Sequence, residues 1–127
     1  MEFSVYHKLS GSIGNLNMPN LKRVSFWTGA ANNICGNTKD LSSFNFPLLQ
    51  AIWLSRTQVS GDVSDITASS LQAVDWIGSN LVYGDITVLI NNTNISWFYM
   101  PSCPNLTGDI ANLRNNTKLT GLIVNNT

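Results

Sequence analysis

Hydrophobic and polar positions recur along this chain in a fixed order. Five times an aliphatic residue is followed two or three positions later by glycine, then by a polar residue and usually by a β-branched one. These segments are 9–13, 34–38, 59–63, 81–86 and 106–110, and their first residues lie 25, 25, 22 and 25 positions apart. A single unit of this length cannot bury its own apolar edge, so such a period indicates one unit repeated along an axis. The pattern therefore predicts a repeat solenoid.

A second hydrophobic pattern follows each glycine segment. One further aliphatic residue comes first, and three apolar residues spaced by three and two positions come next. The aliphatic residues are Leu16, Leu41, Ile66, Leu89 and Leu113, and the triplets are Leu21-Val24-Phe26, Leu49-Ile52-Leu54, Leu71-Val74-Trp76, Ile95-Phe98-Met100 and Leu119-Leu122-Val124. The last two positions of each triplet alternate with polar or exposed ones, which is typical of a short strand with one buried side.

These strands are predicted to lie side by side and parallel. With Phe3 and Val5 in a leading half repeat, the chain provides six of them. The gaps between the glycine segments and the predicted strands vary in length, which favours irregular or 3-10 turns on the convex side. No stretch has the caps and the 3.6-residue period of a long helix. The strand residues expected to share one apolar column are Phe26, Leu54, Trp76 and Met100.

Residues between the buried strand positions are expected to point onto the opposite, concave face. Three of the four tryptophans fall there, whereas Trp76 takes a core position. Exposed aromatic side chains with few charges among them are typical of a binding patch for a sugar ring, a proline-rich peptide or an apolar protein surface. Alternatively, they stack on one another or bury against another domain. The candidate ligand-binding residues are Arg23, Trp27, Trp53, Asp75, Trp97 and Tyr99.

A small residue three positions beyond the strand completes the repeat. It is Thr57, Ser79, Cys103 or Thr127, and the full pattern reads Leu-x-x-Leu-x-Leu-x-x-(Thr/Ser/Cys) running into Leu-x-Gly-Asp-Ile. This pattern resembles the leucine-rich repeat family, in the Gly-x-Ile turn variant seen in plant receptors and bacterial surface proteins. The resemblance covers almost the whole chain, although Thr, Ser and Cys replace the usual Asn ladder.

The resemblance implies a single solenoid over residues 1–127, with about five repeats after a leading half repeat, or a piece of a longer array. It favours a secreted or cell-surface protein, while the N-terminus has neither the charged start nor the apolar stretch of a signal peptide. Neither end of the chain shows a polar cap, so we expect the open ends to be capable of self-association.

Charge and composition exclude several classes of partner. Seven basic and seven acidic residues cancel, and only 11% of the 127 residues are charged, against about 25% in an average protein. So flat a balance argues against nucleic acid or an anionic membrane as the partner. No apolar run approaches the roughly 20 residues of a membrane span, so we expect no membrane insertion.

The aspartates of the glycine segments form a candidate metal site. Asp62, Asp85 and Asp109 recur at one repeat position, where the first two copies have Ser12 and Asn37. Stacked carboxylates are able to share a Ca²⁺ ion, which takes six to eight oxygens. Only three of the five copies are acidic, however, so the favoured interpretation is that each side chain hydrogen-bonds its own turn. We therefore expect no metal and no cofactor.

Other chemistry-bearing residues give little support for a site. His7, the single histidine, has no assigned partner, and no phosphate loop, metal-spaced Cys/His set or nucleophile elbow occurs. Cys35 and Cys103 are expected to lie about 14 Å apart, at about 4.8 Å per strand, too far for a disulfide. Asn-x-Ser/Thr sequons begin at Asn91, Asn94, Asn105, Asn115 and Asn125. They suggest a glycosylated, secreted protein, but the favoured interpretation is that they arise by chance in a chain this rich in Asn, Ser and Thr.

The sequence therefore favours a non-enzymatic recognition module that binds a protein or carbohydrate partner through its aromatic concave surface. The alternative is a structural component, such as a segment of a surface fibre or virion, whose aromatic face and uncapped ends pack on other subunits. A third interpretation is an accessory domain of a larger enzyme. Fold resemblance alone does not decide among them.

Overall fold

The computed structural model describes residues 2–4, 9–26 and 33–125, which form short strands and 3-10 helices. Five strands each hold the middle residue of a hydrophobic triplet: β3 (Arg23–Ser25), β5 (Ala51–Trp53), β7 (Ala73–Asp75), β9 (Trp97–Tyr99) and β11 (Gly121–Ile123). A sixth, β1 (Glu2–Ser4), holds Phe3 of the leading half repeat. Five more strands lie in the glycine segments, the last of them ending just before its glycine: β2 (Ser10–Ser12), β4 (Asn33–Asn37), β6 (Gln58–Asp62), β8 (Val82–Asp85) and β10 (Asn105–Thr107). A 3-10 helix follows each of these strands, directly in the first four cases and after two residues in the last: η1 (Ile13–Asn15), η2 (Thr38–Leu41), η3 (Val63–Asp65), η4 (Ile86–Asn91) and η5 (Ile110–Asn115).

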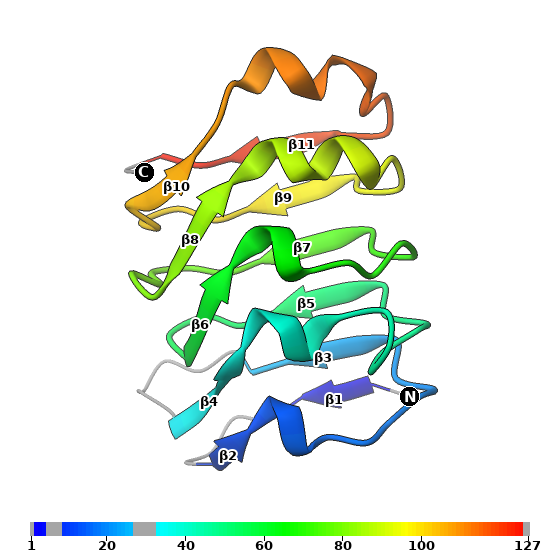
Figure 1. The fold of residues 1–127 in the computed structure, drawn as a ribbon, viewed down its shortest axis with the longest axis vertical. Coiled ribbons are helices and arrows are strands. Elements are labelled where there is room, and N and C mark those ends of the chain that lie inside the picture. Colours follow the sequence, from blue (N-terminus) through cyan, green and yellow to red (C-terminus); the bar gives the residue numbers. More distant parts are fainter. Residues whose placement is uncertain (1, 5–8, 27–32, 126–127) are drawn as a thin grey trace.

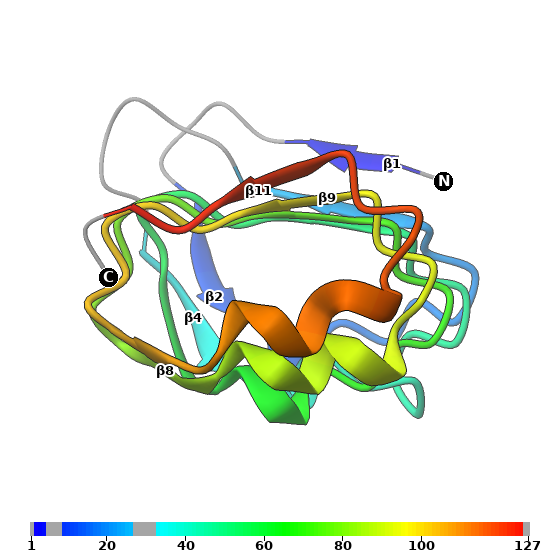
Figure 2. The ribbon, with the colours of Figure 1, turned by 90° about the horizontal axis from the view of Figure 1, so that it is seen from above.

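The strands form two parallel sheets. Their orders are β1-β3-β5-β7-β9-β11 and β10-β8-β6-β4-β2, so strands that are neighbours in a sheet are two apart in the chain. Each circuit of the chain visits the six-stranded sheet, the five-stranded sheet and a 3-10 helix, and successive circuits lie one above another (Figure 1). Viewed along the stack, the 3-10 helices lie opposite the six-stranded sheet (Figure 2). The predictions of a mostly β chain with parallel strands and few helices are confirmed.

The five-stranded sheet was not predicted, because the glycine segments were interpreted as turns. Their glycines have φ between +112° and +142°, a conformation that side chains disfavour. The chain nevertheless stays extended enough to pair with the next circuit, as in the hydrogen bond from Gly61 N to Leu81 O at 3.1 Å. Glycine, serine and asparagine have low strand propensity, so the composition of these segments conceals their pairing.

The fourth glycine segment also begins one residue later than the sequence suggested. Val82 is fully buried, whereas Leu81 is 44% exposed. Val82 stands two positions before Gly84, as Val59 does before Gly61. In the last four copies a buried aliphatic strand residue thus precedes the glycine by two, and the repeat at this point is more regular than we predicted.

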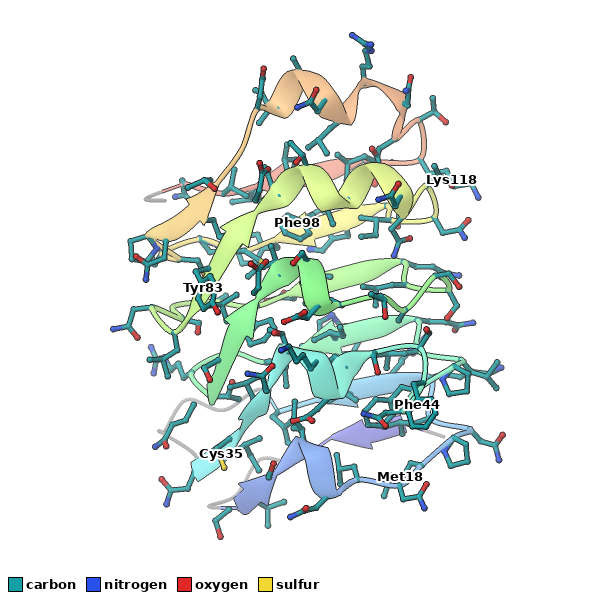
Figure 3. All side chains as sticks on the ribbon, viewed as in Figure 1. Met18, Cys35, Phe44, Tyr83, Phe98 and Lys118 are labelled. Atoms are coloured by element: carbon teal, nitrogen blue, oxygen red, sulfur yellow. The ribbon has the colours of Figure 1, made fainter. Side chains whose placement is uncertain are left out.

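The core lies between the two sheets and the 3-10 helices. The predicted column is confirmed, since Phe26 is 3% exposed and Leu54, Trp76 and Met100 are fully buried. The first four complete triplets are buried throughout, including Phe98, which Figure 3 labels. Leu119, Leu122 and Val124 of the last triplet are only partly buried, because no further circuit of the described chain covers them.

Small polar residues satisfy the backbone at the corner after the six-stranded sheet. Thr57 Oγ1 donates to Leu54 O at 3.3 Å, and Cys103 Sγ donates to Trp76 O at 3.4 Å. Both described cysteines are free, as predicted. Burial raises the pKa of the Cys103 thiol, which suppresses the reactive thiolate. Part of the hydrogen bonding expected of the Thr/Ser/Cys position is therefore present.

An asparagine ladder does exist, but at the opposite corner, where the chain re-enters the six-stranded sheet. Asn92 Nδ2 donates to Ala68 O at 3.0 Å, and Asn116 Nδ2 donates to Leu89 O at 2.8 Å and to Asn92 O at 3.2 Å. Each amide thus joins one circuit to the circuit before it. The position after each strand of the six-stranded sheet still holds Thr57, Ser79 and Cys103 in place of asparagine, so these asparagine bonds come in addition to those of the first corner.

Candidate functional site

The outer face of the six-stranded sheet holds the residues that alternate with its buried positions. Strand register places them in two rows: Arg23, Ala51, Ala73, Trp97 and Gly121 in one, and Ser25, Trp53, Asp75, Tyr99 and Ile123 in the other. The structure thus brings Arg23, Trp53, Asp75, Trp97 and Tyr99 onto one surface, as predicted. Trp27 lies outside the described residues. Their role in binding stays a prediction.

Two aromatic rings form a platform on strand β9. Trp97 and Tyr99 are stacked, with ring centroids 6.2 Å apart and ring planes 24° apart. Trp97 is 40% exposed. Its six-membered ring lies directly against Gly121 of the neighbouring strand, in the space that a Cβ atom would fill. Glycine at this position therefore lets the indole ring rest on the sheet, with much of its surface open to solvent.

A half-buried carboxylate stands beside this platform. Asp75 lies in register between Trp53 and Tyr99, one strand away from each. Its Oδ1 atom is buried and has no hydrogen-bond partner among the described residues. Burial raises the pKa of Asp75, because desolvation disfavours the charged form. Asp75 is the single acidic residue in β3, β5, β7, β9 and β11.

Small residues on the outer face are covered by their larger neighbours. Ser25 is 8% exposed and Ala51 is 4% exposed although both lie on this face. Arg23 is exposed next to Glu2 of β1, which continues its row, and Trp53 is partly buried in the other row. The side chains therefore close over the sheet near β3 and β5, and the more open aromatic surface lies over β9 and β11.

The aspartate positions of the glycine segments cap the 3-10 helices. Asp62 accepts from Ser64 N, Asp85 from Thr87 N and Asp109 from Ala111 N, each at 2.8 Å. Asn37 and Ser12 accept in the same way from Lys39 N and Gly14 N in their circuits. The interpretation that each side chain hydrogen-bonds its own turn is confirmed. Within the described chain, no group of three His, Cys, Asp or Glu residues is placed to hold a metal ion.

Some exposed apolar side chains were missed. Phe44 is 93% exposed and Leu48 is 45% exposed, and both belong to the longest gap between a second aliphatic residue and its strand. Figure 3 labels Phe44 and also Tyr83, which is 51% exposed. The length of the insertion between Leu41 and Leu49 was the available signal, but length alone does not say that an aromatic ring points outward.

Four of the five sequon asparagines lie in a 3-10 helix, a turn or a strand whose contacts the structure shows. Asn91 and Asn115 are exposed, and each stands directly before a ladder asparagine. The side chains of Asn94 and Asn105 already donate, to Ser69 O at 3.2 Å and to Asn80 O at 2.7 Å. Two sequons are thus explained by an Asn-Asn-Thr turn that repeats with the fold. His7 lies outside the described residues.

Comparisons with known proteins give no family for this chain. No protein-family model matches it, and a search of curated proteins finds no significant match. In the described part of the structure, no helix has the length and apolar character needed to cross a bilayer.

Proposed function

We propose that this chain is a leucine-rich-repeat-type solenoid that recognises a protein or carbohydrate partner without catalysing a reaction. The regular circuits and the aliphatic and asparagine positions that join them support the repeat assignment. The observation that carries the recognition function is the platform of Trp97 and Tyr99 on the outer face. Surface aromatic rings that are held rigid and left open are the side chains that most often supply binding energy.

The packing of Trp97 supports this function. An indole ring needed only for the fold would be buried like Trp76, which is fully covered. Trp97 instead lies flat against Gly121 and stays 40% exposed. Little conformational entropy is lost when a ligand contacts a ring that is already fixed, so the arrangement favours binding.

Labelled protein on a glycan array and on a peptide array tests the proposal. We expect binders in at least one array and at least about tenfold weaker binding by Trp97→Ala, in line with the cost of truncating an interfacial hot spot. Phe44→Ala is the matched control, since it removes an even more exposed ring away from the platform. Binding that Phe44→Ala weakens as much as Trp97→Ala, or no binding in either array, argues against the proposal.

The structural alternative has its own supporting observation. Ile110 is 63% exposed, while Ile13, Val63 and Ile86 at the same repeat position are at most 4% exposed. An uncovered circuit of this kind presents apolar surface that another subunit is able to bury. Concentration-dependent assembly in sedimentation velocity, lost in Ile110→Ser or Trp53→Ala, would favour this alternative over recognition.

A further inference from the structure

The chemistry around Asp75 narrows the kind of group that the outer face binds. A carboxylate on this surface has an aromatic residue in register on each side, Trp53 on β5 and Tyr99 on β9. Neither neighbour carries a positive charge, and Oδ1 of Asp75 has no hydrogen-bond donor in the described structure. Because Oδ1 is buried, an external donor reaches the carboxylate through its other oxygen, Oδ2, to which no described residue is seen to donate.

We propose that Asp75, with Trp53 and Tyr99, binds a basic side chain of a protein partner, with arginine favoured over lysine. The inference rests on the proposed recognition function and specifies its ligand. A carboxylate attracts a cation directly, and the negative faces of neighbouring aromatic rings attract it as well. The surroundings of Asp75 thus favour a cation and disfavour an anion.

The spacing fits a flat cation. Trp53 and Tyr99 are two strands apart, which is about 10 Å between backbones at about 4.8 Å per strand. A planar group with an aromatic ring on each side needs about 7–8 Å between the rings, at about 3.5–4 Å per contact. A guanidinium group is planar, weakly hydrated and stacks on aromatic rings while it donates a charge-assisted hydrogen bond to a carboxylate oxygen. An ammonium group makes the charge contact without the stacking.

The burial of Asp75 adds to the argument. The charged carboxyl is disfavoured by desolvation, which raises its pKa, and a bound cation offsets this cost. Asp85 differs, since the backbone N–H of Thr87 already satisfies it and lowers its pKa. Of these two carboxyl groups, Asp75 is therefore the one that gains from an external partner.

A titration with short peptides tests the inference. The probe is acetyl-Gly-Arg-Gly-amide, and its matched control replaces arginine by citrulline, which has nearly the same shape but no charge. Chemical shifts of the tryptophan indole N–H groups report binding, with an expected Kd on the order of millimolar for so small a ligand. We expect the citrulline peptide and the Asp75→Asn protein each to bind about tenfold more weakly, as for a lost charge-assisted hydrogen bond.

Two further arms make the outcome decisive. Asp109→Asn removes one negative charge but keeps a side chain that is able to cap η5, so its affinity for the arginine peptide should match the wild type. Glucosamine carries a positive charge that N-acetylglucosamine lacks, so this pair of sugars tests whether the site binds a cationic sugar. Stronger binding of glucosamine than of the arginine peptide overturns the choice of a protein partner.

Equal binding of the arginine and citrulline peptides, or no effect of Asp75→Asn, overturns the cation site. Array binding that depends on Trp97 can persist in that case, so the proposed recognition function then stands without this inference.

Discussion

Replacing Gly84 by alanine tests how the circuits are held together. Gly84 has φ of +112°, and a Cβ atom there would overlap Oδ1 of Asp62 on the preceding circuit. Asp62 is not free to move away, because the same oxygen accepts from Ser64 N at 2.8 Å and caps η3. The substitution therefore strains one circuit and loosens the cap of another.

The expected magnitude has three parts: backbone strain, displacement of the cap and crowding. An L-residue held in this backbone region costs about 1–3 kcal/mol. Displacing the Asp62 cap costs about 1 kcal/mol, and crowding in a packed site typically costs a further 1–3 kcal/mol, roughly. We expect Gly84→Ala to lower the free energy of unfolding by about 4 kcal/mol, which leaves a domain of ordinary stability, about 5–15 kcal/mol, still folded.

Two other glycines distinguish the cost of backbone strain from the cost of a clash between neighbouring circuits. Gly11 occupies the same motif position with φ of +142°, and Gly78 lies at a corner with φ of +69°, yet a Cβ atom at either would meet nothing within 4 Å. Gly11→Ala and Gly78→Ala should each cost about 2 kcal/mol, from strain alone. The difference from Gly84→Ala corresponds to about 8 °C in the melting temperature, at about 4 °C per kcal/mol.

The free energy of unfolding is measured in urea by tryptophan fluorescence. The variants are Gly84→Ala, Asp62→Ala and the double variant that combines these two substitutions. Removing the Asp62 carboxylate makes room for the alanine, so the double variant should be less destabilised than the sum of the single variants by about 1 kcal/mol or more. Additive effects, or a Gly11→Ala variant as unstable as Gly84→Ala, would refute the idea that glycine is needed for contact between circuits.

Three further predictions concern single side chains. Asn116→Ala removes two hydrogen bonds to carbonyl groups of the previous circuit, each of which keeps one backbone donor. At about 0.5–1.5 kcal/mol per bond it should cost about 1–3 kcal/mol in urea unfolding, whereas Asn94→Ala at an exposed position should cost under about 1 kcal/mol. Asp75→Asn should stabilise the fold at pH 7, and the stability difference between wild type and variant should shrink as pH falls toward the ordinary aspartate range. In native protein, Cys35 should react with a thiol reagent before Cys103, which is buried and has a raised pKa.

The sign of the Asp75 effect follows from its raised pKa. A native state that holds the proton more tightly than the unfolded chain gains stability as pH falls through the interval above the unfolded pKa. Asp85 has the opposite shift and loses stability on acidification, so only the comparison of wild type with Asp75→Asn isolates Asp75. A stability difference that widens on acidification would contradict the assignment.

The parallel strands and their buried residues could be predicted because burial acts on side chains that the sequence displays. The triplet ending in Trp76 alternates regularly, and burial of alternate positions fixes the face of a strand. The same alternation placed Asp75 and Trp97 on the outer face. The hydrophobic pattern was therefore sufficient to predict the structure wherever burial of an apolar side chain determines it.

Features that depend on backbone contacts between circuits were missed. The sheet of glycine segments forms through main-chain hydrogen bonds, which leave no hydrophobic signature. The amide of Asn116 bridges to Leu89 and Asn92, but asparagine is equally common in turns that bridge nothing. The exposed ring of Phe44 likewise follows no repeat, since its segment occurs once.

The corners and the core of this fold each require particular residues, whereas the outer face of the six-stranded sheet requires few. The corners are fixed by glycines, capping aspartates and ladder asparagines, and the core is fixed by aliphatic and aromatic packing. Trp97 and Asp75 satisfy none of these requirements: one ring stays open to solvent, and one carboxylate oxygen is buried without a partner. A serine or threonine at either position would preserve the strand at lower cost. We propose that these side chains, which lie on one face and outside the core and the corners, contact another molecule.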